Sequence, residues 1–125
     1  MTQRPGPRPL LPIGQVLVRG RSMEPHLRDG DRLLVRWDRA AVRAARPGSV
    51  AVIRLPGGRP LSIKRLAFRE SGGWWVERDN PAEGVDSWQV GAVPEADVLA
   101  IAQFRIWPGP GRITGPHRAG GNPAE

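Results

Sequence analysis

Ser22 and Lys64 are the two residues of this chain whose types best suit covalent chemistry. Lys64 is the only lysine among nineteen Lys+Arg residues, so every other fixed cation is an arginine. Arginine serves as well for solubility and ion pairing, but lysine alone can lose its proton near neutral pH when desolvated. Ser22 precedes a turn-forming Glu24-Pro25 pair, and an exposed turn hydroxyl suits acyl transfer. Together they predict a serine nucleophile with a lysine general base.

Other catalytic and metal-binding arrangements fit the sequence less well. The two histidines are His26, which has no clear orienting carboxylate, and His117, which lies near the end of the chain, so a Ser-His-Asp triad is not expected. The chain has no cysteine and no His-Glu-x-x-His spacing, and we expect neither a metal site nor a cofactor. Residues 56–60 contain two glycines but lack the spacing of a phosphate-binding loop.

The strongly basic composition limits the classes of partner that the protein is expected to bind. The formal net charge is +7 and the isoelectric point is near 11.6, but the arginines are scattered and no nucleic-acid-binding motif is present. We therefore expect a protein substrate, which a basic surface could steer, and no nucleic acid. No apolar run approaches the roughly 20 residues of a membrane span. With the absence of cysteine, this predicts a cytoplasmic protein without a membrane anchor.

The elements that must position Ser22 and Lys64 are short strands separated by Gly- and Pro-containing turns. Strands are expected at residues 15–18, 32–37, 49–55, 61–68, 74–78 and 98–107, with one helical turn at 40–46. Ser22 then lies on the turn after the first strand, and Lys64 lies within the fourth. The pattern predicts a compact, mostly β single domain over residues 13–107. Residues 1–12 and 108–125, rich in Pro, Gly and Arg, are expected to be disordered tails.

Three segments, taken in order, resemble the conserved boxes of the type I signal peptidases. They are residues 20–27 with Gly30-Asp31 for the nucleophile box, residues 63–66 for the lysine box, and Asp79-Asn80, Asp86-Ser87 and Gly91 for the third box. Residues 47–50, Pro-Gly-Ser-Val, also resemble a segment that precedes the strand between the first two boxes. The resemblance covers about residues 15–107. It implies a signal-peptidase-like and LexA-like β fold and a serine endopeptidase with a Ser-Lys dyad.

Carried over by position, the resemblance makes Ser22 the nucleophile and Lys64 the general base, which later protonates the leaving amine. The backbone N–H of Ser22 would supply part of the oxyanion hole. Gly20, two residues earlier, has no side-chain hydroxyl that could act as a second donor. The apolar neighbours Ile63 and Leu66 favour a buried Lys64 with a pKa below its ordinary value of about 10.4.

The resemblance also implies supporting roles for four further residues. Arg65, paired with Asp79 or Asp86, would brace the lysine strand against the third box. Asn80 would hold the loop of that box. Each of these polar residues also suits ordinary turn chemistry, so the supporting roles are predictions that the geometry must test.

The chain departs from the signal peptidases in three ways. No membrane anchor is seen before the serine box, Arg78 replaces the usual glycine, and Gly84 replaces a serine that often orients the lysine. Together with Gly73-Trp74-Trp75, these features resemble the nickel-type superoxide dismutase maturation proteases, intracellular relatives that remove an N-terminal extension from the dismutase precursor. That precursor is therefore the expected substrate. The alternatives are a signal-peptidase-like enzyme with another substrate, a LexA-type repressor core, or a non-catalytic basic binding module.

Overall fold

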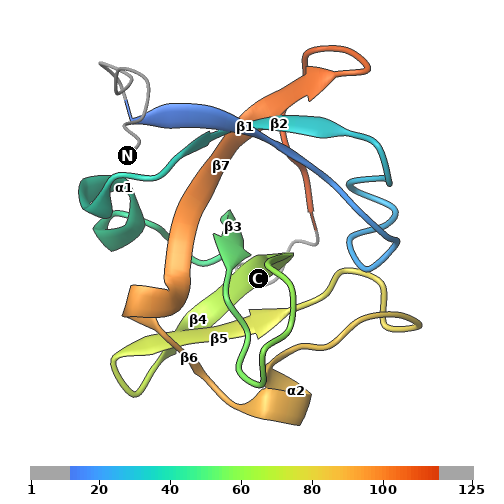
Figure 1. The fold of residues 1–125 in the computed structure, drawn as a ribbon. Helices are drawn as coiled ribbons and strands as arrows, with labels where there is room; N and C mark the ends of the chain where they lie inside the picture. Colours follow the sequence, from blue (N-terminus) through green and yellow to red (C-terminus); the bar gives the residue numbers. More distant parts are fainter. Residues whose placement is uncertain (1–11, 116–125) are drawn as a thin grey trace, which may run out of the picture.

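Seven antiparallel strands form one strongly curled sheet in the computed structural model, which describes residues 12–115 (Figure 1). The strands are β1 (Ile13–Leu17), β2 (Arg32–Arg36), β3 (Val50–Ile53), β4 (Ser62–Glu70), β5 (Gly73–Glu77), β6 (Val93–Pro94) and β7 (Val98–Trp107). Their spatial order is β1-β2-β7-β3-β4-β5-β6. The expected mostly β fold is confirmed. Three short helical segments complete it: α1 (Arg39–Arg43), α2 (Ser87–Val90) and the 3-10 turn η1 (Glu95–Asp97).

All six expected strands and the helical turn α1 are present, while β6, α2 and η1 were not expected. β6 has two residues, one of which is a proline, so it leaves no apolar alternation in the sequence. α2 has four residues and depends on a capping box at its first turn. β6 is set by its pairing with β5 and α2 by its cap, and periodicity cannot reveal elements this short. None of the helices among residues 12–115 is long and apolar enough to cross a lipid bilayer.

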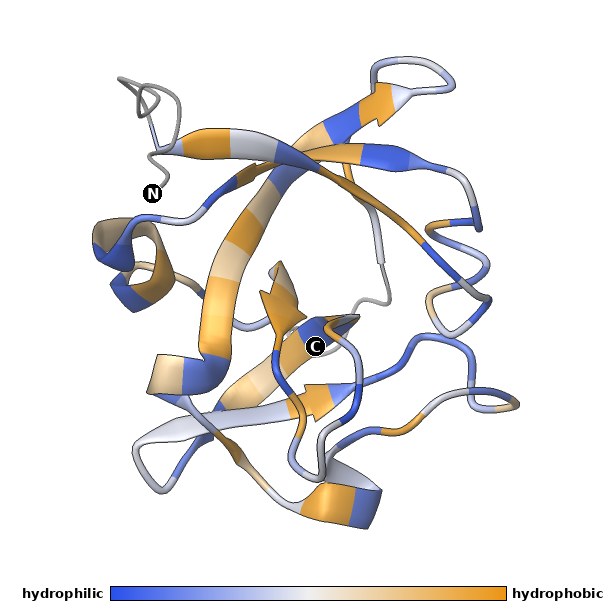
Figure 2. Ribbon diagram, in the orientation of Figure 1, coloured by the Kyte–Doolittle hydropathy of each residue, from blue (hydrophilic) through white to orange (hydrophobic). Residues whose placement is uncertain are grey.

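The buried strand β3 separates two hydrophobic clusters, and its hydrophobic residues stand out at the centre of Figure 2. Successive side chains of a strand point to opposite faces. Ala51 and Ile53 accordingly join one cluster, and Val50 and Val52 join the other. The first cluster holds Val42, Leu66, Trp74, Val76, Val93, Val98 and Ile101 among others. The second holds Val18, Met23, Leu27, Leu33, Val35 and Ala100, and so includes residues flanking Ser22.

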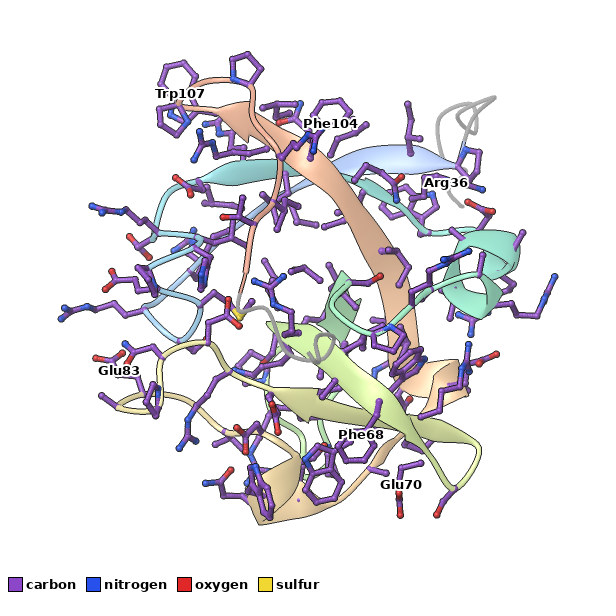
Figure 3. The ribbon with its side chains drawn as sticks, turned by 180° about the vertical axis from the view of Figure 1, so that it is seen from behind. Arg36, Phe68, Glu70, Glu83, Phe104 and Trp107 are labelled. Carbon is purple, nitrogen blue, oxygen red and sulfur yellow. The ribbon has the colours of Figure 1, made fainter. Side chains whose placement is uncertain are left out.

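Residues beyond β7 contact the domain after the expected boundary at residue 107. Arg105 and Gly111 exchange two backbone hydrogen bonds of 2.9 and 3.0 Å, and Ile113 packs against the second cluster. The backbone oxygen of Thr114 accepts a hydrogen bond of 2.7 Å from Arg65. Trp107, at the end of β7, lies at the opposite end of the molecule from Phe68 (Figure 3). The rest of the two expected tails, residues 1–11 and 116–125, lies outside the described residues.

Candidate active site

Ser22 lies in the loop after β1, directly before a helical turn of residues 23–27. The N–H of Leu27 donates to the backbone oxygen of Met23 at 3.0 Å, and both side chains are buried in the second cluster. The base of the loop is closed by Val18, whose N–H donates to the oxygen of Asp31 at 2.8 Å. The serine is thus carried on a loop that is anchored both by its apolar neighbours and at its base.

Lys64 reaches Ser22 from strand β4. It is paired with Ala51 of β3, only 3% of its surface is exposed, and its Nζ lies 3.2 Å from Ser22 Oγ. The two residues predicted to react together are therefore within hydrogen-bonding distance. Among the described residues, Lys64 is the hydrogen-bond partner of the Ser22 hydroxyl, and His26 is not.

Asn80 connects the third box to the serine loop. Its backbone N–H donates to the oxygen of Ser22 at 2.7 Å, and its side-chain amide donates to the oxygen of Arg21 at 2.9 Å. Its Oδ1 accepts from the N–H of Ala82 at 3.0 Å, which orders the next residues of its own loop. Asn80 is therefore hydrogen-bonded both to its own loop and to the loop that carries Ser22.

Arg65 and Asp79 form a buried, bidentate ion pair behind the lysine strand. Arg65 Nη2 lies 2.6 Å from Asp79 Oδ2, and Nε donates to Oδ1 at 3.2 Å. The remaining Arg65 donors reach the backbone oxygens of Gly48 and Thr114. The expected partner of Arg65 was Asp79 or Asp86, and the structure selects Asp79. The same carboxylate contacts His26 Nδ1 at 2.9 Å, so the expectation that His26 lacks an orienting carboxylate is wrong.

Asp86 has a different role from the one considered for it beside Arg65. It caps α2, since Oδ1 accepts from the N–H of Trp88 at 3.0 Å and its own N–H donates to Gln89 Oε1 at 2.9 Å. Its other oxygen accepts from the N–H of Arg78 at 3.3 Å, and Arg78 Nε lies 3.9 Å from it. The side chain of Asp86 is therefore engaged with α2 and with Arg78.

Arg78 and Gly84 lie beside the Ser-Lys pair. Arg78 Nη1 donates to the backbone oxygen of Gly84 at 2.7 Å. Gly84 has a φ of +95°, and a Cβ placed on it would lie 2.8 Å from Ser22 Cβ and 3.2 Å from Lys64 Nζ. The position of the missing serine is therefore in contact with both residues. The sequence signalled Arg78 only as a departure from glycine, and no function was predicted for it.

The surroundings of Lys64 favour its neutral form. Burial lowers the pKa of Lys64 from its ordinary value of 10.5, the carboxylate of Asp86 acts in the opposite direction, and the positive charge of Arg78 adds to the effect of burial. The net result is a lowered pKa. A lysine in this position can supply an unprotonated amine at a lower pH than a solvated lysine can.

A small cleft of about 120 Å³ opens at the pair. Its lining residues are Leu17, Arg19, Ser22, Leu61, Ser62, Ile63 and Lys64. β3 pairs with β4 through residues 62–65, whereas β5 pairs with β4 only from Arg65 onward, so residues 62–64 have an unpaired edge within the described sheet. The N–H of Leu66 donates toward β3, to Ser49. By strand alternation the N–H and C=O of Ile63 point to the unpaired edge.

The backbone N–H of Ser22 is available as a hydrogen-bond donor. The N–H of Ser22 has no hydrogen-bond partner within residues 12–115, whereas the N–H of Gly20 donates to Asp29 Oδ1 at 2.7 Å. The Gly20 amide is thus engaged in holding its own loop. The Ser22 amide is free to donate to a negatively charged oxygen beside Ser22 Oγ.

The chain was compared with known protein families. Residues 13–102 match the model of the Peptidase S24-like family, and the chain belongs to that family. It is a serine peptidase domain of the clan that includes the LexA-like and signal-peptidase-like enzymes. A search of curated proteins gives no match to the chain.

Proposed function

We propose that the protein is a serine endopeptidase in which Ser22 is the nucleophile and Lys64 is the general base. The observation that carries the proposal is the 3.2 Å separation between Ser22 Oγ and the buried Lys64 amine. The lowered pKa of Lys64 supports it, because a base must be unprotonated to act. The unpartnered N–H of Ser22 supports it as well, since acyl transfer needs a donor at that place.

The steps follow from these positions. The neutral Lys64 amine takes the hydroxyl proton of Ser22, and Oγ bonds to the carbonyl carbon of the scissile peptide bond. The resulting oxyanion is stabilised by the Ser22 N–H. The carbon–nitrogen bond then breaks, and the Lys64 ammonium gives its proton to the departing amine. Lys64, neutral again, removes a proton from water, which hydrolyses the Ser22 ester and restores the enzyme.

We propose that the substrate binds as an extended strand along residues 62–64. The unpaired edge of β4 offers the N–H and C=O of Ile63 to a peptide backbone, as in other strand-addition complexes. Leu17, Leu61 and Ile63 give the cleft apolar walls. A peptide on this edge leads to Lys64 and Ser22, so its backbone is delivered to the nucleophile.

The substrate we propose is the cytoplasmic precursor of a nickel-type superoxide dismutase. Support comes from the sequence: Gly73-Trp74-Trp75 precedes the third box, and Gly84 stands in place of the usual serine. Removal of an N-terminal extension would free the amine and adjacent side chains that bind nickel in the mature dismutase.

The test is to incubate the protein with the dismutase precursor and sequence the N-terminus of any product, with Ser22→Ala as the control. Cleavage by the wild type alone at one bond supports both the mechanism and the substrate. If the precursor stays intact while an unrelated secretory precursor is cut, the substrate proposal fails and the peptidase proposal survives. If the wild type cuts neither protein, and does not cut itself, the basic binding module becomes the leading interpretation.

A further inference from the structure

We propose that Arg78 is a positioning residue, which fixes residues 81–84 against the Ser22–Lys64 pair and sets the local charge around Lys64. The inference rests on the proposed function, because it assigns Arg78 a part in the same site. It goes beyond the sequence motifs, in which position 78 appeared only as a departure from glycine.

The first observation is that Arg78 forms hydrogen bonds to the loop of residues 81–84, which has few other hydrogen bonds. Its two terminal nitrogens donate to the backbone oxygens of Gly84 at 2.7 Å and Pro81 at 3.1 Å. The start of the loop is held by Asn80 through the N–H groups of Ala82 and Glu83. Residues 81–84 are otherwise exposed, and Glu83 points outward from this loop in Figure 3. The planar guanidinium suits this double contact, because its donors form a fixed fork.

The second observation is that this loop forms one wall of the reacting pair. The hypothetical Cβ of Gly84 would lie 2.8 Å from Ser22 Cβ, 3.2 Å from Lys64 Nζ and 3.6 Å from Arg78 Cδ. Gly84 therefore packs its backbone against both reacting side chains, with Arg78 directly behind it. Release of the loop would open this side of Lys64 to water. A hydrated amine holds its proton more strongly than a buried one.

The third observation concerns the charged groups near Lys64. Asp86 faces it from the start of α2, Arg78 faces it from the end of β5, and Arg19 lines the same cleft. Asp86 favours the ammonium form of Lys64, while Arg78 disfavours it. Arg78 Nε also lies 3.9 Å from Asp86 Oδ2, so the guanidinium partly neutralises the negative charge that Lys64 meets at that carboxylate. Asp86 is needed for the cap of α2, and the positive charge of Arg78 opposes the effect of the Asp86 carboxylate on Lys64.

Two substitutions separate the charge of Arg78 from its hydrogen bonds. Arg78→Met removes both, whereas Arg78→Lys keeps the charge but cannot reproduce the fork that spans two backbone oxygens. Arg43→Met is the matched control, because Arg43 is an exposed residue at the end of α1 and is not among the charges acting on Lys64. Each variant is assayed for kcat/KM against pH on a peptide that the wild type cleaves.

We expect the acid limb of the Arg78→Met profile to move up by about one pH unit, which is a roughly tenfold loss below the limb. The Arg78→Lys variant keeps the charge but frees the loop, so its limb should move up less than that of Arg78→Met, and its kcat should fall. Arg43→Met should match the wild type throughout. An Arg78→Met limb that coincides with the wild-type limb would overturn the inference, whatever happens to the rate.

A second measurement needs no substrate. Because Lys64 is the only lysine, labelling with ¹³C-lysine gives one Cε resonance whose titration reports the pKa of this residue. We expect that pKa to be higher in Arg78→Met than in the wild type. A higher pKa in a protein that cleaves nothing would retain the inference and reject the proposed function. If the wild type cleaves peptide but Lys64 has the same pKa in the wild type and in Arg78→Met, the proposed function is retained and the inference about Arg78 is rejected.

Discussion

Lys64→Arg should abolish cleavage although it keeps the positive charge. Arginine remains protonated at any usable pH, so it cannot take the proton of Ser22. Loss of a positioned general base lowers rates by about 10² to 10⁴, or roughly 3 to 5 kcal/mol on the activation barrier. The 3.2 Å contact with Ser22 Oγ leaves no room for an intervening base, which places the expected loss toward the upper end of that range.

Lys64→Met is the companion substitution, because it removes the base and keeps an unbranched side chain of similar length. Position 64 is 3% exposed and faces Arg78, so a permanent guanidinium there must be buried beside a like charge. We expect Lys64→Arg to be less stable than the wild type and Lys64→Met to fold normally. Both variants should be inactive, for different reasons.

The lowered pKa of Lys64 also predicts how the stability of the protein depends on pH. The folded-state pKa of Lys64 is lower than its ordinary 10.5, so between the two values the unfolded chain holds one more proton. The free energy of unfolding contributed by this residue should then rise with pH in that interval, with a slope of at most about 1.4 kcal/mol per pH unit. Lys64→Met should remove this slope.

The assays are kcat/KM on a quenched fluorescent peptide and urea unfolding followed by tryptophan fluorescence, both across the alkaline range. Unfolding shows whether each variant is native at the pH of the activity measurement. Near wild-type cleavage by a folded Lys64→Arg enzyme would refute general-base catalysis by Lys64. If Lys64→Met were inactive and Lys64→Arg active, residue 64 would act as a fixed charge instead.

Three further predictions test the supporting structure. Asp79→Asn should lower the free energy of unfolding by about 3 to 5 kcal/mol, because it leaves the Arg65 guanidinium buried without its carboxylate; a urea-unfolding change below about 1 kcal/mol would contradict this. Gly84→Ala should lower kcat by about 10², because its Cβ would displace Ser22 or Lys64. Gly72→Ala is its control, with a similar positive φ but open space around it, and equal kcat losses in the two would refute the steric argument. Methylating the substrate amide that pairs with the C=O of Ile63 should lower kcat/KM about tenfold, as expected for one lost hydrogen bond, and a scan of N-methylated peptides with no sensitive position would exclude strand addition.

The sequence predicted the strands well because their apolar runs are long relative to the turns between them. β7 and β4 carry most of their residues in continuous apolar or alternating stretches, and Gly or Pro punctuates their ends. Ser22 and Lys64 were singled out by their residue types, and the structure places Lys64 Nζ 3.2 Å from Ser22 Oγ. The sequence predicted that Arg65 pairs with Asp79 or with Asp86. The path of the chain after β5 places Asp79 beside it.

The remaining contacts depend on geometry that no local pattern records. His26 meets Asp79 across fifty-three residues of sequence, because the serine loop and the end of β5 are folded together. Arg78 attracts little notice in a chain with eighteen arginines, and its position beside Lys64 follows from the turn of residues 78–84. Such side chains are placed by tertiary packing, so their partners become visible only when the strands are assembled.

The place of β7 in the sheet has a consequence for the biosynthesis of the protein. β7 is the last strand of the described chain, yet it lies between β2 and β3, and it pairs the β1–β2 half of the sheet with the β3–β6 half. A nascent chain that has not yet released residues 98–107 from the ribosome contains Ser22 and Lys64 but not the strand that joins their two halves. Proteolytic competence should therefore arise only after nearly all of the domain has been translated. Delayed assembly of this kind would protect neighbouring nascent chains, and the enzyme itself, from premature cleavage.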